Sequence, residues 1–453
     1  MDTIAAVSTA LAPGGIGIIR ISGPKAINIV KKFFKSSDGQ DLEKIGGYRA
    51  KLGKAFDESG VIDEVIVLIF RAPRSYTGEN VAEISCHGGV YIAKKILNLA
   101  LKNGAKLAKA GEFTKRAFLN GKIDLSKAEA VADLISAQGE KAERLAISGL
   151  EGNINKKISE IKSFLIDIVA ELSVWADYPE DDIPQAKEFS LKKNLSKVKS
   201  ELLKISEKEK AIRALNEGLK VSIVGCPNVG KSSLLNLLTG YQRAIVTDIA
   251  GTTRDIVDGH TMLGEIPIKL FDTAGIRDSK DTVEKIGVDK AKQYLIDSDL
   301  AFVLFDGSRK LTVEDMEVIN LVNKDKAIAI INKIDLGICK EISEINKFFK
   351  KVVKMSTKES LGVEDLKNAV YDFINMDSLS TSEPFVSGQR QFDVINRAIL
   401  AIEEIESAVN SGVTLDAVTV LVQNSIEILG EITGENVSEE IIDKIFSNFC
   451  VGK

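Results

Sequence analysis

Apolar and polar residues follow three different patterns along the chain, and each pattern predicts a different architecture. Up to about residue 117, short apolar runs between glycine-containing turns predict strands at 16–23, 65–70 and 81–85. Apolar residues at helical spacing predict helices at 26–34 and 90–101. The first part of the chain is therefore expected to be a small α+β domain.

From about residue 115 to residue 217 the pattern is almost wholly helical, with apolar residues every three or four positions. The acidic segment 177–184 contains two prolines, which cannot continue a helix, so one long helix is expected to end there and another to begin after it. One apolar stripe in this part consists of Leu125, Ala128, Val131, Ala132 and Ile135.

Between about residues 217 and 377, apolar runs typical of buried strands alternate with helical segments, which predicts a mostly parallel sheet with helices on both faces. The helical pattern then returns and continues to Lys453. We interpret this order as a helical domain with an α/β domain inserted between its halves. The expected strands are 220–225, 268–272, 300–306 and 327–332. The expected divisions are 1–117, 118–216, 217–377 and 378–453.

Charge and cysteine content narrow the classes of function. The formal net charge of −5 excludes a general nucleic-acid coat protein, although it leaves a local basic patch possible. Four widely spaced cysteines without a Cys-x-x-Cys pair disfavour a disulfide framework and a structural zinc site. The chain has no signal-peptide pattern and no apolar run near the roughly 18 residues of a membrane span. A cytoplasmic protein is therefore expected.

The segment 225–232, GCPNVGKS, matches the phosphate-binding P-loop pattern and lies between a predicted strand and a predicted helix. Backbone N–H groups of such a loop, together with the helix N-terminus, hold phosphate oxygens. Lys231 would place a positive charge on the terminal phosphates, and the Ser232 hydroxyl would bind Mg²⁺. The alternative interpretation is an ordinary glycine turn before a helix.

Two later motifs point to a GTPase. In DTAG (272–275), Asp272 follows a predicted strand and is placed to hold Mg²⁺ through water, while Gly275 would donate its N–H to the γ-phosphate. In NKID (332–335), the Asp335 carboxylate can accept two N–H bonds from guanine, which adenine does not offer. The alternative for Asp335 is a helix N-cap. Ser356 lies where a backbone N–H could contact guanine O6.

The motif order GCPNVGKS, GTTRD, DTAG, NKID resembles that of the translation-factor-like GTPases. Over its whole length the chain more closely resembles the MnmE (TrmE) family of tRNA-modification GTPases. The shared motifs are DTIAA, GIGIIRISG, YTGENVAEISCHGG, GEFTKRAFLNGKIDLSKAEAVADLI, TDIAGTTRD, EITGE and a terminal CVGK, in which Val451 replaces the usual isoleucine.

This resemblance implies a multidomain α/β chain. It would consist of an N-terminal α+β domain that binds tetrahydrofolate and dimerises, an α-helical domain, and an inserted Ras-like P-loop G domain. The family works as a homodimer with the FAD-dependent protein MnmG (GidA). Together they add an aminomethyl or carboxymethylaminomethyl-type group to C5 of the wobble uridine, position 34, of certain tRNAs. The one-carbon unit would come from 5,10-methylenetetrahydrofolate or 5-formyltetrahydrofolate, and GTP hydrolysis is required.

The resemblance also implies how GTP would be hydrolysed. Ile276 stands where many small GTPases have a water-orienting glutamine, and an alkyl side chain cannot orient water. The family uses K⁺ to supply positive charge and a catalytic glutamate, matched here by Glu284, when two G domains pair. Arg277 would help to align that segment. The alternatives are that Asn228 only braces the loop and that Glu284 is a solvated charge at a helix start.

The expected metal contacts are Ser232 and Thr253 for Mg²⁺, and Asn228, Thr247, Ile249 and Thr252 for K⁺. The residues expected to contact GTP are Asn228, Val229, Gly230, Lys231, Ser232, Ser233, Thr247, Asp248, Ile249, Ala250, Gly251, Thr252, Thr253, Asp272, Thr273, Ala274, Gly275, Asn332, Lys333, Asp335 and Ser356.

By the same resemblance, the folate site would contain Arg20, Glu83, Lys122 and Lys453. Cationic side chains suit the glutamate tail of a folate, and a carboxylate can accept hydrogen bonds from a pterin. Cys450, near the C-terminus, is a candidate catalytic thiol, with a small apolar core residue as the alternative.

Two other functions share the G domain. One is a ribosome-assembly GTPase switch of the Era type, which would need an RNA-binding module, and no GXXG loop of KH type follows the G domain. The other is a regulatory switch whose flanking domains bind only protein. Neither accounts for the N-terminal motifs or for the CVGK terminus.

Overall fold

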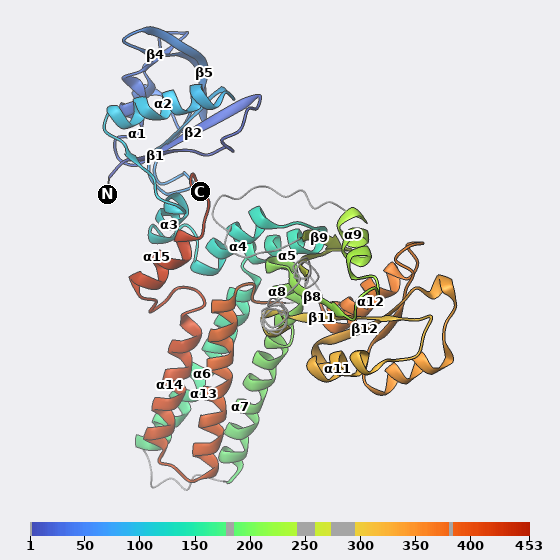
Figure 1. Cartoon of the computed structure of the whole chain (residues 1–453). Helices are drawn as coiled ribbons and strands as arrows, with labels where there is room; N and C mark the ends of the chain where they lie inside the picture. The colour runs from blue at the N-terminus through green and yellow to red at the C-terminus, as the bar shows by residue number, and fades with distance from the viewer. Residues whose placement is uncertain (1, 178–184, 242–258, 273–294, 380–383) are drawn as a thin grey trace, which may run out of the picture. The chain divides into compact units, whose positions relative to one another are not determined.

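The computed structural model describes residues 2–177, 185–241, 259–272, 295–379 and 384–453 (Figure 1). Its contacts divide the chain into two compact units. Unit 1 consists of Met1–Ala132 and Ile426–Lys453, and unit 2 consists of Asp133–Ser425. The two ends of the chain therefore belong to one unit, although the whole of unit 2 separates them in sequence.

Unit 1 is built on a seven-stranded sheet with the strand order β3-β4-β5-β6-β2-β1-β7, in which only β1 and β7 pair in parallel. Alternate side chains of its strands, such as Ile19, Ile21, Val65 and Val67, are buried beneath α1 and α2 (Figure 1). The strands are β1 Ile4–Val7, β2 Ile16–Ser22, β3 Phe34–Ser36, β4 Arg49–Asp57, β5 Gly60–Phe70, β6 Val81–His87 and β7 Lys106–Leu107. The helices are α1 Ala26–Lys31, η1 Leu42–Lys44 and α2 Val90–Lys102.

The three predicted strands fall on β2, β5 and β6, but the pattern missed β1, β3, β4 and β7. In β4 only Gly53 and Ala55 are buried, so the strand carries almost no apolar alternation. The predicted helix 26–34 ends early, at Lys31, because the buried pair Phe33 and Phe34 leads directly into β3.

Helices α3 Glu112–Leu119 and α15 Glu439–Ser447, together with α4 Leu125–Ser136 up to Ala132, complete unit 1. Leu125 and Ala128 of α4 are buried against Phe446 and Phe449 from the C-terminal segment. The predicted apolar stripe on α4 is therefore correct at its start, whereas Ile135 at its end is 44% exposed.

In unit 2, four long helices run side by side: α6 Asn153–Asp177, α7 Gln185–Ser206, α13 Gln389–Asn410 and α14 Leu415–Gly430 (Figure 1). The predicted break is confirmed, because α6 ends at Asp177 and α7 begins at Gln185. Ion pairs join α6 to α7 and α7 to α13. Shorter helices, α5 Glu140–Leu150 and α8 Glu209–Glu217, flank α6 and α7 in sequence. The buried stripe of α7 consists of Leu191, Leu195, Val198, Leu202 and Ile205.

Unit 2 also contains a six-stranded sheet with the order β13-β12-β11-β8-β10-β9, in which only β9 is antiparallel to its neighbour. The mostly parallel sheet is confirmed, and the four predicted strands match β8, β10, β11 and β12. The strands are β8 Leu219–Gly225, β9 Gly259–Leu263, β10 Ile266–Asp272, β11 Leu300–Asp306, β12 Ala327–Asn332 and β13 Val352–Lys354. Its helices include α9 Lys231–Tyr241, α11 Val313–Leu321 and α12 Val363–Phe373.

The two missed strands, β9 and β13, lie at opposite edges of this sheet and have five and three residues. Edge strands have one paired side, so they need no continuous apolar run. The parallel strands β8, β10, β11 and β12 all end at the same edge of the sheet. The predicted nucleotide motifs occur where three of these strands end: the P-loop after β8, DTAG at the end of β10 and NKID at the end of β12.

Candidate functional site

The P-loop connects β8 to α9, as its pattern requires. Gly225 and Gly230 have φ angles of 154° and 103°, which disfavour any residue with a side chain. A Cβ on Gly225 would overlap the carbonyl oxygen of Leu304, and one on Gly230 would overlap the side-chain nitrogen of Asn332. The two glycines of the motif are therefore required by the close approach of neighbouring strands as well as by the loop conformation.

Lys231 folds back over the P-loop. Its Nζ donates to the carbonyl oxygens of Gly225 at 2.9 Å and of Cys226 at 2.8 Å. Ser232 and Ser233 follow Lys231 in the first turn of α9 and are exposed. This helix N-terminus suits a phosphate chain, because it combines a lysine ammonium, backbone N–H groups and serine hydroxyls.

Asn332, at the end of β12, ties three segments together. Its Nδ2 donates to Val229 O of the P-loop at 2.8 Å and to Thr357 Oγ1 at 3.1 Å, while its Oδ1 accepts from Thr357 N at 3.0 Å. The side chain is only 1% exposed. The amide uses both of its ends on the protein, so its geometry is that of a brace between the P-loop and the loop that contains Ser356.

Asp335 and Ser356 meet beside this brace. The Ser356 hydroxyl donates to Asp335 Oδ1 at 2.6 Å and is fully buried. The backbone N–H of Ser356, predicted to contact guanine O6, instead donates to Leu361 O at 3.1 Å. The serine hydroxyl thereby fixes the orientation of the carboxylate predicted to recognise guanine.

Asp306, at the end of β11, was not predicted from the sequence. Its carboxylate lies 2.6 Å from Nζ of Lys333, which has a left-handed φ of 64°. Burial alone would raise the pKa of Asp306, but hydrogen bonds from Lys333 and Ser308 lower that pKa below its usual value. The ion pair fixes Lys333 of the NKID motif. The sequence feature that could have identified Asp306 is an aspartate at the end of an apolar strand.

A second missed cluster lies behind the P-loop. Asp315 is 1% exposed and accepts from Arg309 Nη1 at 2.6 Å and from the Thr312 N–H and hydroxyl, both at 2.9 Å. Burial, and then the neighbouring Asp315 carboxylate, raise the pKa of the Cys226 thiol to about 12. Cys226 is therefore a protonated, unreactive part of the loop at neutral pH.

Several predicted residues lie outside the described residues. They are Thr247, Asp248, Ile249, Ala250, Gly251, Thr252, Thr253, Thr273, Ala274, Gly275, Arg277 and Glu284. For Asp272 the structure gives the backbone, which ends β10 and pairs with Ile223 of β8. Of the predicted potassium contacts, only Asn228 is described. It is exposed and has a left-handed φ of 61°.

In unit 1, Arg20 is the centre of the predicted folate residues. Its Nε donates to Glu83 Oε1 at 2.8 Å across the β2–β6 pair. The guanidinium carbon lies 5.6 Å from the ring centroids of both Tyr76 and Phe113. These two aromatic residues were not singled out from the sequence, although they occur in the quoted motifs YTGENV and GEFTKR.

The C-terminal tail is bound at the same place. The Gly452 carbonyl accepts from Ser8 Oγ at 3.0 Å and from Arg20 Nη1 at 3.5 Å, and the Lys453 carbonyl accepts from Phe113 N at 3.2 Å. Gly452 is buried with a φ of 95°, and a Cβ there would overlap the carbonyl oxygen of Val7. The glycine of CVGK is therefore required by the docking of the tail.

Lys122 donates to Pro73 O at 3.2 Å and packs beside Gly78, on the loop that carries Tyr76. Of the predicted folate residues, Glu83 contacts Arg20 directly, Lys453 is held near it by its backbone, and Lys122 contacts the loop that carries Tyr76. Cys450 is exposed, and its carbonyl accepts from Gly111 N, so the alternative of a small apolar core residue is wrong.

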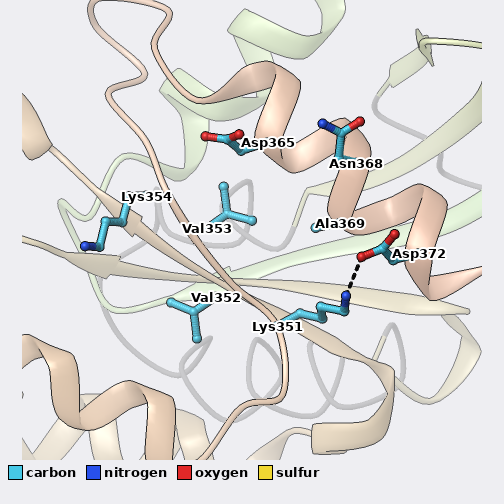
Figure 2. Close-up of a pocket in the computed structure, with 8 residues that line it drawn as sticks. All are labelled: Lys351, Val352, Val353, Lys354, Asp365, Asn368, Ala369 and Asp372. Carbon is cyan, nitrogen blue, oxygen red and sulfur yellow. Dashed lines mark hydrogen bonds and ion pairs between the residues drawn. The ribbon is translucent and has the colours of Figure 1, made fainter.

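A shallow pocket of about 400 Å³ lies between β13 and α12 (Figure 2). Its lining includes the ion pair of Lys351 and Asp372, whereas none of the predicted site residues lines it. Within the described ranges no three His, Cys, Asp or Glu residues are grouped to hold a metal, and no helix is long and apolar enough to cross a membrane. His87 Nδ1 lies 2.6 Å from Asp63 Oδ1, within hydrogen-bond distance.

Comparison with known proteins matches two family models: "GTP-binding protein TrmE N-terminus" over residues 3–122 and "MnmE helical domain" over residues 125–450. The chain is 44% identical to the tRNA modification GTPase MnmE of Alkaliphilus oremlandii, over 100% of this chain and 99% of that protein. It is 42% identical to the protein of the same name from Clostridioides difficile, with the same coverage.

Among solved structures, Era of Aquifex aeolicus bound to GDP and aluminium fluoride is 29% identical over 40% of this chain and 66% of that chain, with a TM-score of 0.29. The two relatives above match this chain over its whole length. Full-length similarity favours the tRNA-modification prediction over the ribosome-assembly alternative.

Proposed function

Since the chain belongs to the MnmE (TrmE) family of tRNA modification GTPases, we propose that it hydrolyses GTP in the modification of the wobble uridine of tRNA. With a flavin-dependent partner of the MnmG (GidA) kind, it adds an aminomethyl or carboxymethylaminomethyl-type group to C5 of uridine 34, using a folate one-carbon unit. The observation that carries the GTPase assignment is the Asn332 brace, which joins the P-loop to the Asp335–Ser356 pair.

In this proposal the P-loop N–H groups, Lys231 and Ser233 hold the phosphates, and Asp335, oriented by Ser356, recognises guanine. Mg²⁺ is held by the Ser232 hydroxyl and, on the evidence of sequence motifs, by Thr253 and by Asp272 through water. The exposure of Ser232 beside Lys231 supports this role. The ion would offset negative charge on the phosphates. We propose that all the residues expected from the sequence to contact GTP do so.

K⁺ would supply further positive charge during hydrolysis, held by Asn228 with Thr247, Ile249 and Thr252. The left-handed backbone of Asn228, in the exposed part of the P-loop, supports a role in presenting an oxygen at the surface of the loop. Glu284 is the proposed catalytic residue that orients water when two G domains pair. Arg277 aligns the segment that contains it.

GTP turnover in two salts tests this chemistry. Hydrolysis in KCl should be much faster than in NaCl at equal ionic strength, and equal rates would remove the potassium assignment. Glu284→Ala should keep GTP binding and lose most of the turnover, by about 10²-fold or more, the usual contribution of a positioned catalytic group. Turnover equal to that of wild type would contradict the role of Glu284.

We further propose that the cluster around Arg20 binds tetrahydrofolate. Cationic groups of Arg20, Lys122 and Lys453 suit its glutamate tail, and Glu83 suits the donor edge of the pterin. The ring of Tyr76, which is 38% exposed beside Arg20, supports a site for a planar ligand, whereas Phe113 is buried beneath the guanidinium group. The exposed Cys450 thiol remains a candidate catalytic group there.

Titration with 5-formyltetrahydrofolate tests the folate assignment. Glu83→Ala should weaken binding by about tenfold or more, as expected for one charge-assisted hydrogen bond to a ligand. Because Glu83 also holds Arg20, Glu83→Gln is the matched variant: it keeps an oxygen near Arg20 but loses the charge. Unchanged affinity in both variants would refute the site.

The proposal includes a homodimer formed through unit 1. The sheet face opposite α1 and α2 exposes, on either side of the charged Lys54–Glu64 pair, the apolar pairs Leu52–Ile66 and Phe56–Val61. These side chains are 51%, 47%, 36% and 63% exposed, respectively. Exposed apolar side chains grouped on one sheet face are typical of a protein interface. Ile66→Glu should therefore produce monomers in sedimentation equilibrium, and a dimer unaffected by this charge would exclude the face.

The partner MnmG, a tRNA substrate and a cytoplasmic location complete the proposal, together with the four-part division 1–117, 118–216, 217–377 and 378–453. The net charge of −5 suggests that tRNA is held by a local patch or shared with the partner. The decisive experiment analyses uridine 34 in tRNA from a strain that lacks this gene. Normal modification there would eliminate the proposed function.

A further inference from the structure

The turn between β9 and β10 is held between two helices of unit 2. Glu265 Oε2 accepts from the backbone N–H of Lys141, in the first turn of α5, at 2.8 Å. On the other side, the Glu265 N–H donates to the hydroxyl of Tyr371, on α12, at 3.0 Å. Gly264 has a φ of 65°, and a Cβ there would overlap the same hydroxyl. The turn therefore fits its surroundings closely on both sides.

Helix α5 receives its N-terminal cap from this turn. Its own N-cap residue is Gly139, whose backbone is extended and which has no side chain to accept a hydrogen bond. A carboxylate at a helix N-terminus satisfies a backbone donor and interacts favourably with the helix dipole. Glu265 thus supplies from another element the acceptor that Gly139 cannot provide.

The same place is reinforced by a small cation–π cluster. Nζ of Lys141 lies 5.9 Å from the ring centroid of Tyr371, and Nζ of Lys367 lies 5.7 Å from it. Both distances are within the range at which such pairs attract. One aromatic ring therefore links α5, the hairpin turn and α12.

The hairpin leads directly to the nucleotide motifs. β10 ends at Asp272, the first residue of DTAG, and pairs in parallel with β8, which continues into the P-loop. β9 begins at Gly259, shortly after the TDIAGTTRD motif. The paired strands β9 and β10 therefore connect the Glu265 turn directly to the strand end that carries Asp272. At the other side of the contact, α5 is followed after two residues by the 25-residue α6.

We propose that the Gly264–Glu265 turn is the contact that transmits the nucleotide state of the G domain to α5, with Glu265 as the positioning residue. The inference rests on the proposed GTPase function. In a purely structural contact, by comparison, the Gly264–Glu265 turn would hold α5 equally in every nucleotide state. Coupling requires that GTP and GDP bias the contact differently, and this can be measured at α5 itself.

Hydrogen–deuterium exchange of the full-length chain provides the test, with Mg²⁺ and K⁺ present and with either GDP or a non-hydrolysable GTP analogue. In the wild type, exchange in the first turn of α5 should differ between the two nucleotides by about fivefold or more, the lower end of usual coupling. Glu265→Ala should accelerate this exchange by about fivefold, the effect of losing one cap, and should abolish the difference between nucleotides. GTP hydrolysis should stay close to the wild-type rate.

Three further variants separate coupling from simple damage. Glu265→Gln keeps an oxygen acceptor and should retain the nucleotide dependence. Tyr371→Phe keeps the ring but removes the acceptor of the Glu265 N–H, and it should reduce that dependence. Glu317→Ala, at an exposed position of α11, should behave as wild type.

Two results would overturn the proposal. One is equal α5 exchange with both nucleotides in a wild-type chain that hydrolyses GTP. The other is a nucleotide dependence that Glu265→Ala leaves intact. A wild-type chain without GTP hydrolysis would overturn the GTPase assignment as well, so the two failures are distinguishable.

Discussion

Replacing Gly452 by alanine should release the C-terminal tail from unit 1 without affecting the P-loop, which belongs to unit 2. The residue has a φ of 95°, and an added Cβ would lie 2.9 Å from Cα of Ser8 and closer still to the carbonyl oxygen of Val7. A side chain in such a backbone conformation costs about 1–3 kcal/mol before any overlap is counted.

The tail is held by few interactions that could absorb this cost. Ser8 Oγ donates to Gly452 O at 3.0 Å, and Phe113 N donates to Lys453 O at 3.2 Å. Each contributes about 0.5–1.5 kcal/mol, so the strain and the anchoring energy are of similar size. With about 2 kcal/mol of strain, the ratio of docked to free tail should fall by about 30-fold.

The assay combines amide exchange with ligand binding. In Gly452→Ala, the Phe113 amide should lose protection, because its acceptor is the Lys453 carbonyl. Affinity for 5-formyltetrahydrofolate should fall with it, while GTP hydrolysis should be retained. Val451→Ala is the matched control, since that side chain is 57% exposed. The reasoning fails if Gly452→Ala keeps both the protection of Phe113 and the folate affinity of wild type.

Three further outcomes follow from the geometry of unit 2. Gly230→Ala places a methyl group on the Asn332 amide and should weaken binding of a fluorescent GTP analogue by about tenfold or more, the factor for about 1–3 kcal/mol of overpacking. Near-normal affinity would show that the two loops separate easily. Because burial raises the pKa of Cys226 to about 12, iodoacetamide at pH 8 should label the exposed Cys450 well before Cys226, as read by mass spectrometry. Comparable labelling would contradict a buried thiol. Despite burial, hydrogen bonds hold the pKa of Asp315 below its usual value, so this group stabilises the fold above about pH 4 and loses that effect as the pH falls further. Asp315→Asn should flatten this part of a urea-denaturation profile against pH, and an unchanged profile would refute it.

Much of the G-domain sheet was predictable because its central strands are buried on both faces. Residues 300–306 and 327–332 are continuous apolar runs, and the structure begins and ends both strands at those residues. The sheet of unit 1 was less predictable. Its strand β4 is exposed along one face and carries lysines, so local hydrophobicity does not distinguish it from a loop.

In the candidate site, the motif residues could likewise be predicted from the sequence, whereas the contacts that orient them could not. The P-loop, DTAG and NKID motifs are contiguous in sequence and carry the chemistry of phosphate and guanine recognition in their residue types alone. The contacts that orient them come from other strands. Asn332 bonds to Val229, which is 103 positions away, and Asp306 bonds to Lys333, 27 positions away. No local pattern encodes such pairings, because they arise only when parallel strands end at one edge of a sheet.

Residue types and local spacing determined the class of chemistry, the parallel sheet and the break between the two long helices, because steric and hydrophobic preferences act within a few residues. The tertiary structure decided which distant groups meet. The C-terminal Gly452 reaches Arg20 across 432 positions of sequence, and Glu265 caps a helix that begins more than a hundred residues before it. Both contacts depend on close backbone approach, to Val7 at Gly452 and around the hairpin turn at Glu265, and such approach is set by packing of the whole chain rather than by any one segment.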